Sequence, residues 1–446
     1  MRPSRCVVGP EAFELLEHEL IQLGEEGREL RGVMRDELLR RLAEGGSRVA
    51  EEIFGELRSL PMRRGYPYHE PSELSEIRAC SPGWRREETP IPEMVRDKIL
   101  GGFFGRCAGN MLGKPLEFIG ISQGWRGVSQ RFSSRGIKAL EGFVPPAFFT
   151  EEELRRSHIL KATAGNIDRV LRDDDIDYTL INLRVVEKRG GDFNSLDIGQ
   201  EWLENLPYAG VYTAERAAYR NLVNCLEPPE TALHMNPYRE WIGAQIRADL
   251  WGYVCPGGPL RASELAYRDA ALSHVKNGVY GEMMVAGMIA WAFVEDDVER
   301  VIDAGISVIP ERCRLREAVE LVVDAWRRGA GWEEVVSLME DKLRQYHPVH
   351  TVPNAAIVAA ALLWGGGDYT RSITMAVSCG LDTDCNGATV GSIIGVMKGY
   401  KSLGDRVRRV WFEPLSDVLE SYIPGLYGLR ITEAAERIYA AAQRLP

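Results

Sequence analysis

Hydrophobic residues recur with helical spacing along most of this chain. Between residues 10 and 58, apolar side chains such as Phe13, Leu16 and Leu20 return among Arg and Glu residues. The same spacing dominates from Arg96 onward, where strict alternation of apolar and polar residues is rare. Spacing of three or four residues places side chains on one face of a helix. The pattern therefore predicts an all-α protein, with a helical N-terminal extension before the main domain.

A proline-rich segment separates these two predicted parts. Prolines that would interrupt a helix occur at Pro61, Pro67, Pro71, Pro82, Pro90 and Pro92. Such a segment is typical of a linker or of an extended strap on a protein surface. We therefore expect residues 1–92 to form the extension and its linker, and residues 93–446 to form the main domain. The extension is a candidate for homo-oligomer contacts, for a lid or for partner binding.

Several predicted helices of the main domain are rich in glycine. Glycines recur within residues 101–109, and residues 354–367 and 388–399 have a similar small and apolar composition. Glycine costs a helix about 1 kcal/mol relative to alanine. Its repeated use predicts that these helices lie in the buried centre of the domain and approach one another closely.

Composition narrows the possible partners. The chain has 446 residues, 45% hydrophobic and 27% charged, with a formal net charge of −11. Because this charge repels phosphates, no nucleic-acid partner is expected. No apolar run reaches the ~20 residues of a membrane span, and the first residues lack an apolar signal core. The eight cysteines form no CxxC pair. We therefore predict a cytoplasmic protein with reduced thiols and no membrane partner.

The first candidate for chemistry is an acidic run at the predicted start of a helix. Asp173, Asp174 and Asp175 are consecutive, and Asp177 follows. Carboxylates at a helix N-terminus accept hydrogen bonds from free N–H groups, so capping alone is one explanation of the run. Adjacent carboxylates also repel one another, however, and a bound cation would relieve that repulsion.

A second acidic pair lies beside an apolar helix. Asp382 and Asp384 flank Thr383, directly before the small residues of 388–399. Carboxylates next to a core are costly unless they are paired or bind a metal, although capping in a polar loop is the alternative. If the two clusters meet, their oxygens suit Mg²⁺ or Mn²⁺ and not zinc. Two such ions can orient a diol and activate a water.

The order of four motifs resembles that of ADP-ribosylglycohydrolases. These motifs are GGFFGRCAGNMLGKPLEF (101–118), DDDIDYTL (173–180), SHVKNGVYGE (273–282) and GLDTDCNGATVGSIIG (380–395). The resemblance extends over about residues 95–440. It implies an all-α catalytic domain in residues 93–446, with two divalent cations, Mg²⁺ or Mn²⁺, at the base of a cleft.

The resemblance assigns the metal ligands to the two acidic clusters. The implied ligands are Asp173, Asp174, Asp175, Asp382 and Asp384. The family has threonine where this chain has Asp173, and a hydroxyl residue where this chain has Cys385. Since a thiol is a poor ligand for Mg²⁺, we expect Cys385 beside the metals and next to the substrate.

Further residues match family positions near the substrate. Glu117 matches a glutamate that orders or deprotonates the attacking water, and Asp175 is the alternative base. His274 and Tyr280 belong to a stretch beside the substrate, and Gly243 to a glycine-rich stretch that shapes the ADP-ribose pocket. Each also has a structural interpretation: Glu117 as a surface carboxylate, His274 and Tyr280 as packed side chains, and Gly243 as part of a core helix.

The implied function is hydrolysis of the bond between ribose C1″ and nitrogen or oxygen in an ADP-ribosylated protein side chain or a related ADP-ribosyl compound. The family often has Asn before the glycine, whereas Trp241 and Ile242 precede Gly243 here. A small nucleoside-like N-ribosyl substrate is therefore a second interpretation. The third is a non-enzymatic protein that binds ADP-ribose or is structural, although such a protein has no physical reason to keep clustered carboxylates.

Overall fold

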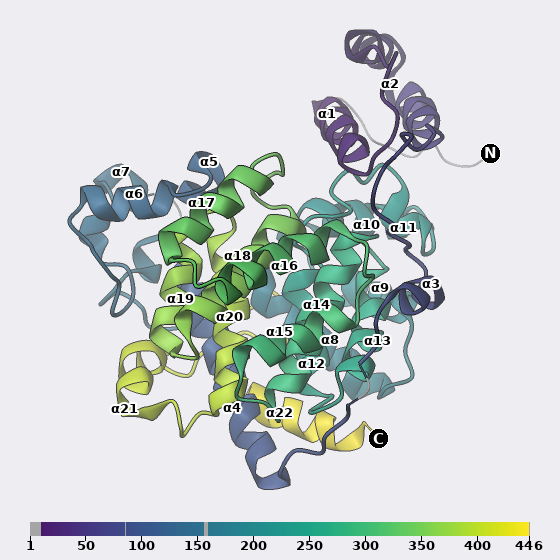
Figure 1. Cartoon of the computed structure of the whole chain (residues 1–446). Coiled ribbons are helices and arrows are strands. Elements are labelled where there is room, and N and C mark those ends of the chain that lie inside the picture. The colour runs from purple at the N-terminus through teal and green to yellow at the C-terminus, as the bar shows by residue number, and fades with distance from the viewer. Residues whose placement is uncertain (1–9, 85, 156–158, 446) are drawn as a thin grey trace.

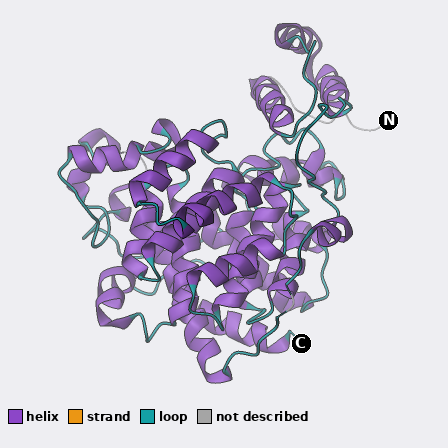
Figure 2. Cartoon of the chain, viewed as in Figure 1, coloured by secondary structure: helices purple, strands orange, loops and turns teal. Residues whose placement is uncertain are grey.

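The computed structural model describes residues 10–84, 86–155 and 159–445. Within these residues the fold is all-α, as predicted, and Figure 2 shows helices joined by loops. Backbone pairing of the β type is limited, over the same residues, to isolated bridges such as Trp241 with His350. None of the described helices is both long and apolar enough to cross a membrane.

The helices fall into an N-terminal group, a group around the site and an outer group. The N-terminal helices are α1 (Pro10–Glu25), α2 (Arg35–Arg58) and α3 (Leu74–Cys80). Those around or beneath the site are α4 (Pro92–Gly113), α5 (Glu117–Gln123), α8 (Asp174–Arg189), α10 (Thr213–Val223), α12 (Asp249–Tyr253), α14 (Asn277–Ala292), α18 (Thr351–Gly365) and α20 (Thr383–Lys398). The outer helices are α6 (Gly127–Ser134), α7 (Glu151–Arg155), α9 (Ser195–Asn205), α11 (Glu230–Leu233), α13 (Pro259–Ala270), α15 (Val298–Ser307), α16 (Arg314–Arg327), α17 (Trp332–Leu343), α19 (Tyr369–Ser378), α21 (Gly404–Val407) and α22 (Ile431–Arg444).

The centre of the domain is a contact between α4 and α20 that requires glycine on both helices. The two helices run antiparallel, with Gly105 facing Gly391 and Gly109 facing Gly387. A Cβ atom on Gly105 would lie 2.2 Å from the carbonyl oxygen of Gly391, and one on Gly109 would lie 2.0 Å from that of Gly387. The obstructing atoms belong to the backbone and cannot rotate away. The predicted close approach of glycine-rich helices is thus confirmed.

Two further central helices, α14 and α18, are buried along their whole length. A helix that is apolar on every side has no face suited to water and is stable only inside a protein. In Figure 1 these helices lie in the middle of the main body; α15 packs against α14, and α16 and α17 pack against α18. Together they form the scaffold on which the helix ends of the site are fixed.

The N-terminal extension has an apolar cluster of its own. Leu15 and Leu16 of α1 pack with Ile53 and Leu57 of α2, and Met235 of the main domain joins them. Figure 1 shows α1 and α2 projecting beyond the main body at the end opposite α22. The helices predicted between residues 10 and 58 are therefore present, and they cover a small part of the main domain.

The proline-rich segment after α2 lies along the main domain as an extended strap. The N–H of His69 donates to the Arg312 carbonyl at 2.7 Å, and that of Gly83 donates to the Ser307 carbonyl at 3.0 Å. The short helix α3, within this segment, was not predicted from the sequence. Backbone hydrogen bonds at both ends hold the strap against the helices beneath it.

The glycine contact gives a direct stability prediction. We expect Gly109→Ala to lower the stability by about 1–3 kcal/mol or more, because overpacking against rigid backbone is costly. The measurement is the thermal unfolding midpoint followed by circular dichroism. The matched control is Gly55→Ala in α2, where an added Cβ meets nothing within 4 Å. If both variants unfold at the same temperature, α4 and α20 do not approach as closely as described.

Candidate active site

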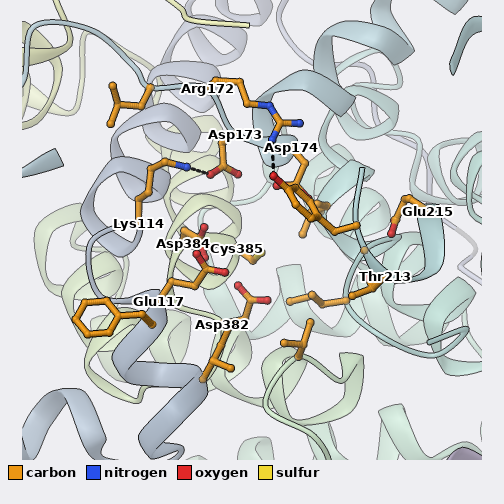
Figure 3. Close-up of a pocket in the computed structure, with 18 of the residues that line it drawn as sticks. Lys114, Glu117, Arg172, Asp173, Asp174, Thr213, Glu215, Asp382, Asp384 and Cys385 are labelled. Carbon is orange, nitrogen blue, oxygen red and sulfur yellow. Dashed lines mark hydrogen bonds and ion pairs between the residues drawn. The ribbon is translucent and has the colours of Figure 1, made fainter. Parts of the chain in front are cut away.

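The glycine contact brings the end of α4 and the start of α20 together. The Thr383 hydroxyl, in the first turn of α20, donates to the carbonyl of Gly113, the last residue of α4, at 2.8 Å. Asp382 and Asp384 therefore lie beside Lys114 and Glu117, which directly follow α4 (Figure 3). Residues separated by more than 260 positions in the sequence thus share one site.

The start of α8 is fixed against α4 by a buried arginine. Arg106, which is 0% exposed, donates through Nε and Nη2 to the Asp175 carbonyl at 3.1 and 2.6 Å. Its Nη1 donates to Asp249 Oδ2 at 2.6 Å. The Asp173 side chain caps α8 by accepting the Asp175 N–H at 3.1 Å. These bonds place the first acidic cluster opposite the second.

A cavity of about 660 Å³ opens between these three helix ends. The acidic residues on its wall are Glu117, Asp173, Asp174, Glu215, Asp382, Asp384 and Glu420. Gly243 and Cys385 also line it. In Figure 3, Lys114 and Glu117 lie on one side of the cavity and Glu215 on the other. The volume lies within the range of about 300–1,000 Å³ that small-molecule sites occupy.

The unpaired oxygens of the second cluster fit a cation site. Asp382 precedes α20, but its side chain makes no capping hydrogen bond. Asp382 Oδ1 and Asp384 Oδ1 are both buried without a hydrogen-bond partner in the described chain. Ligand atoms within each cluster lie within 4.8 Å of one another. Helix capping therefore accounts for the position of Asp173 but not for that of Asp382. Carboxylate oxygens of this kind are hard ligands, which suit Mg²⁺ or Mn²⁺.

The charges in the cavity shift the acidities of the cluster. Burial raises the pKa of Asp382, and the Asp384 carboxylate raises it further. The same Asp384 charge, followed by burial, holds the pKa of Glu117 well above its usual range. For Asp173, burial also favours the neutral acid, but the Lys114 ammonium outweighs it and lowers the pKa to about 2. Asp382 and Glu117 thus lack a nearby positive charge strong enough to offset their burial and mutual repulsion, and a bound cation would supply it.

Two cations on the cavity wall, Lys114 and Arg172, were not predicted from the sequence. Lys114 is the one that pairs with the first cluster's Asp173. Its ammonium forms an ion pair with Asp173 Oδ2 (Figure 3). Although burial lowers the pKa of Lys114, Asp173 and Asp384 raise it by more, so the side chain is charged. Lys114 belongs to the motif of residues 101–118. Its spacing did not indicate contact with Asp173, which lies 59 positions later in the sequence.

Comparisons with known proteins agree with this arrangement of motifs. A protein-family profile described as ADP-ribosylglycohydrolase matches residues 92–445. The chain belongs to the ADP-ribosylglycohydrolase family. A solved structure described as an ADP-ribosylglycohydrolase-related protein complex is 17% identical, with a TM-score of 0.49, and the match covers 78% of this chain and 99% of that chain. No curated protein sequence matches this chain. Membership in a glycohydrolase family supports hydrolase activity.

In this family member, Cys385 lies on the cavity wall and bonds to the first cluster. Its thiol donates to Asp175 Oδ2 at 3.3 Å. Burial and the neighbouring Asp175 raise the pKa of the thiol well above its usual range. A protonated thiol is a donor and not a metal ligand. The thiol thus lies beside the first acidic cluster, and its position next to metal ions stays a prediction.

Not every residue implied by the family resemblance reaches the cavity. His274 is buried, and its Nδ1 bonds the Ser273 hydroxyl at 2.8 Å. The Tyr280 hydroxyl donates to the carbonyl of Pro71 in the strap. Asp175 lies behind the wall, where Arg106 Nη2 donates to its Oδ1 at 3.1 Å. The geometry therefore gives no support to substrate contacts by His274 or Tyr280, whose packed interpretation fits their surroundings.

Glu215 also lines the cavity, although nothing in the sequence around it predicted a position in the site. It accepts a hydrogen bond from buried Arg247 Nη1 at 2.6 Å. A Cβ atom on Gly243 would lie 2.2 Å from Glu215 Oε1. Burial raises the pKa of Glu215 to about 7, despite the opposing charge of Arg247. Glycine at position 243 thus leaves room for this carboxylate at the side of the cavity away from Glu117.

Removal of Lys114 should change how strongly cations stabilise the protein. We expect Lys114→Gln to lower the thermal midpoint in EDTA, because Asp173 loses its partner. Excess Mg²⁺ should raise the midpoint of the variant by more than that of the wild type, since the ion replaces the lost charge. Exposed Lys401→Gln serves as the control. An identical response to Mg²⁺ in all three proteins would show that Lys114 does not neutralise a cation site.

Proposed function

We propose that this chain is a metal-dependent hydrolase that cleaves the bond between ribose C1″ and the acceptor atom of an ADP-ribosylated side chain or related ADP-ribosyl compound. The observation that carries the proposal is the convergence of two acidic clusters on one cavity, where Asp382 Oδ1 and Asp384 Oδ1 are buried and unpaired. Family membership supports the glycosidic class of reaction.

The aspartates would hold two divalent cations, Mg²⁺ or Mn²⁺. The proposed ligands are Asp173, Asp174, Asp175, Asp382 and Asp384. When bound, such ions orient ribose hydroxyls and lower the pKa of an attacking water. The chain itself contributes the fixed positions of these carboxylates, which follow from the buried Arg106 and from the contact between Thr383 and Gly113.

Glu117 is the proposed acid–base residue. It lies on the cavity wall beside Asp384, whose charge is the main cause of its raised pKa. Bound cations would offset that charge and leave Glu117 as a carboxylate able to accept a proton. The water oxygen bonds to C1″ while its proton passes to Glu117. The bond from C1″ to nitrogen or oxygen breaks, and Glu117 returns the proton to the leaving atom. Asp175 is the less suitable base, because both its oxygens already contact Arg106 or Cys385.

The wall before Gly243 favours a second candidate substrate. Ile242 lines the cavity where the family often has a polar Asn. Glu240, two residues earlier, is fully buried and engaged by Arg314 Nη2 at 2.7 Å. This wall offers a diphosphate less polar contact than an Asn would. A small nucleoside-like N-ribosyl compound is therefore the alternative substrate.

Asp382→Asn tests the cation requirement. We expect the variant to lose both the stabilisation by Mg²⁺ and the hydrolysis of ADP-ribosyl substrates, since one ligand oxygen is replaced by an amide nitrogen. Activity should fall by at least about 100-fold, the scale on which even removal of a supporting group can act at a metal site. Exposed Asp405→Asn is the control. Wild-type turnover that persists in excess EDTA would contradict the mechanism, and absence of any cation binding would favour the non-enzymatic alternative.

A substrate panel separates the two enzymatic interpretations. We expect cleavage of ADP-ribosyl-arginine or ADP-ribosyl-serine with Mg²⁺ present, measured as release of ADP-ribose by chromatography. Simple nucleosides in the same assay report the alternative as released free base. Hydrolysis of the nucleosides alone would reject the ADP-ribosyl proposal and keep the metal-dependent chemistry.

A further inference from the structure

A second cavity, of about 440 Å³, lies between α1 and the main domain. Rings dominate the part of its wall where His18 of α1 meets Tyr238, Trp241 and His347 of the domain. The ring centres of His18 and Trp241 are 5.4 Å apart and edge-on, and those of Trp241 and His347 are 4.1 Å apart and stacked. An aromatic wall of this kind is suited to planar ligands.

The second cavity adjoins the acidic cavity. Tyr212 and Thr213 line both, so the two spaces meet at the start of α10. Thr213 has a φ of 39°, which is costly for a β-branched residue and persists only where the surroundings fix it. The Tyr212 hydroxyl accepts a hydrogen bond from Arg172 Nη1 at 3.2 Å, next to the first acidic cluster. A ligand held at the acidic cavity could therefore extend past Tyr212 toward the rings.

The charge of the second cavity fits a neutral ligand. Glu11 and Glu14 on its wall are matched by Arg216 and Arg220. Burial lowers the pKa of His347 to about 4, so its ring is uncharged at neutral pH. Neutral imidazoles can both donate and accept hydrogen bonds, as the edges of heterocyclic bases require. These properties favour an uncharged heterocycle over a phosphate or a cation.

Buried ion pairs fix α1 to the segment that carries Trp241. Arg239 Nη1 donates to Glu19 at 2.6 Å, and its Nε donates to Glu26 at 2.7 Å. Gln22 Nε2 donates to Glu240 at 2.8 Å. Breaking one partner of such a buried pair is strongly destabilising. These bonds hold α1, and with it His18, against the segment that carries Trp241.

We propose that the N-terminal extension completes the substrate site, with His18 of α1 and Trp241 binding the heterocyclic base of a ribosyl substrate whose C1 lies at the acidic cavity. This inference rests on the proposed function and adds a specificity-determining helix to it. The base comes from one of two sources. It is either the base at the far end of an ADP-ribosyl group or the base attached to C1 of a nucleoside.

The test compares binding by the full chain and by His18→Ala, with Mg²⁺ present, in calorimetric titrations of ADP-ribose, ribose 5-phosphate and adenosine. Loss of a stacking ring should weaken binding of the base-containing ligand about tenfold. Ribose 5-phosphate, which has no base, should bind the variant as it binds the wild type. His18→Phe, which keeps a ring, should restore affinity to within about twofold. Ile21→Ala, on the exposed face of α1, is the control and should match the wild type.

The pattern of losses identifies the source of the base. Weaker binding of ADP-ribose supports the inference and places the base at the far end of the substrate. Weaker binding of adenosine alone supports it and places the base on C1. Equal loss for all three ligands, no loss for any, or failure of the wild type to bind any base-containing ligand would overturn it. Because binding needs no turnover, a wild type that binds without hydrolysing refutes only the proposed hydrolysis.

Discussion

The whole site depends on the glycine-to-glycine contact of α4 and α20. Gly105 and Gly109 meet Gly391 and Gly387 with their backbones in contact, so neither helix can rotate or slide without a clash. That fixed register sets which residues meet where α4 ends and α20 begins. Lys114 and Glu117 follow α4, and Asp382 and Asp384 lie at the start of α20. The small residues cost each helix intrinsic stability, and that cost is offset by close packing of two buried helices. The geometry of the acidic site and the packing of the core therefore depend on the same contact.

The acidic site is held by a fully buried arginine and a half-buried lysine. Arg106 extends from the centre of α4 to the first turn of α8, and its contacts with the Asp175 carbonyl and with Asp249 leave it fully enclosed. Its role is geometric, since it aligns the first cluster with the second. Lys114 neutralises Asp173 alone, and the remaining carboxylates raise one another's pKa values. An arrangement of this kind is poorly stable by itself and gains most from binding divalent cations, as the proposed reaction requires.

Local pattern predicted much of this fold, and long-range contact accounts for what it could not predict. Helical spacing and glycine content correctly indicated an all-α domain with central glycine-rich helices, because both are properties of residues close together in the sequence. The two aspartate clusters were recognisable as a candidate cation site from the residues around them. The sequence did not indicate the ion pair of Lys114 with Asp173. It also did not indicate how His274 is buried or that Tyr280 bonds to the strap. Each depends on which distant segment packs against the residue, and a single sequence carries no record of that. Glu215 is the clearest case, since only the space beside Gly243 reveals it.

The altered cavity wall before Gly243 lies against the N-terminal extension. Trp241 and Ile242 stand where the family often has a polar residue before the glycine. The structure gives the bulky Trp241 a function in packing, because His18 of α1 and His347 lie against it. The preceding Arg239 and Glu240 are bonded to α1 through Glu19, Glu26 and Gln22. Without the extension, Arg239 would lose both of its carboxylate partners, Glu19 and Glu26. The extension is also anchored elsewhere on the domain, for example by the ion pair of Arg58 with Glu230 at 2.8 Å. The N-terminal extension thus supplies the charges that accompany the unusual cavity wall, and removing it would leave Arg239 unpaired beside Trp241.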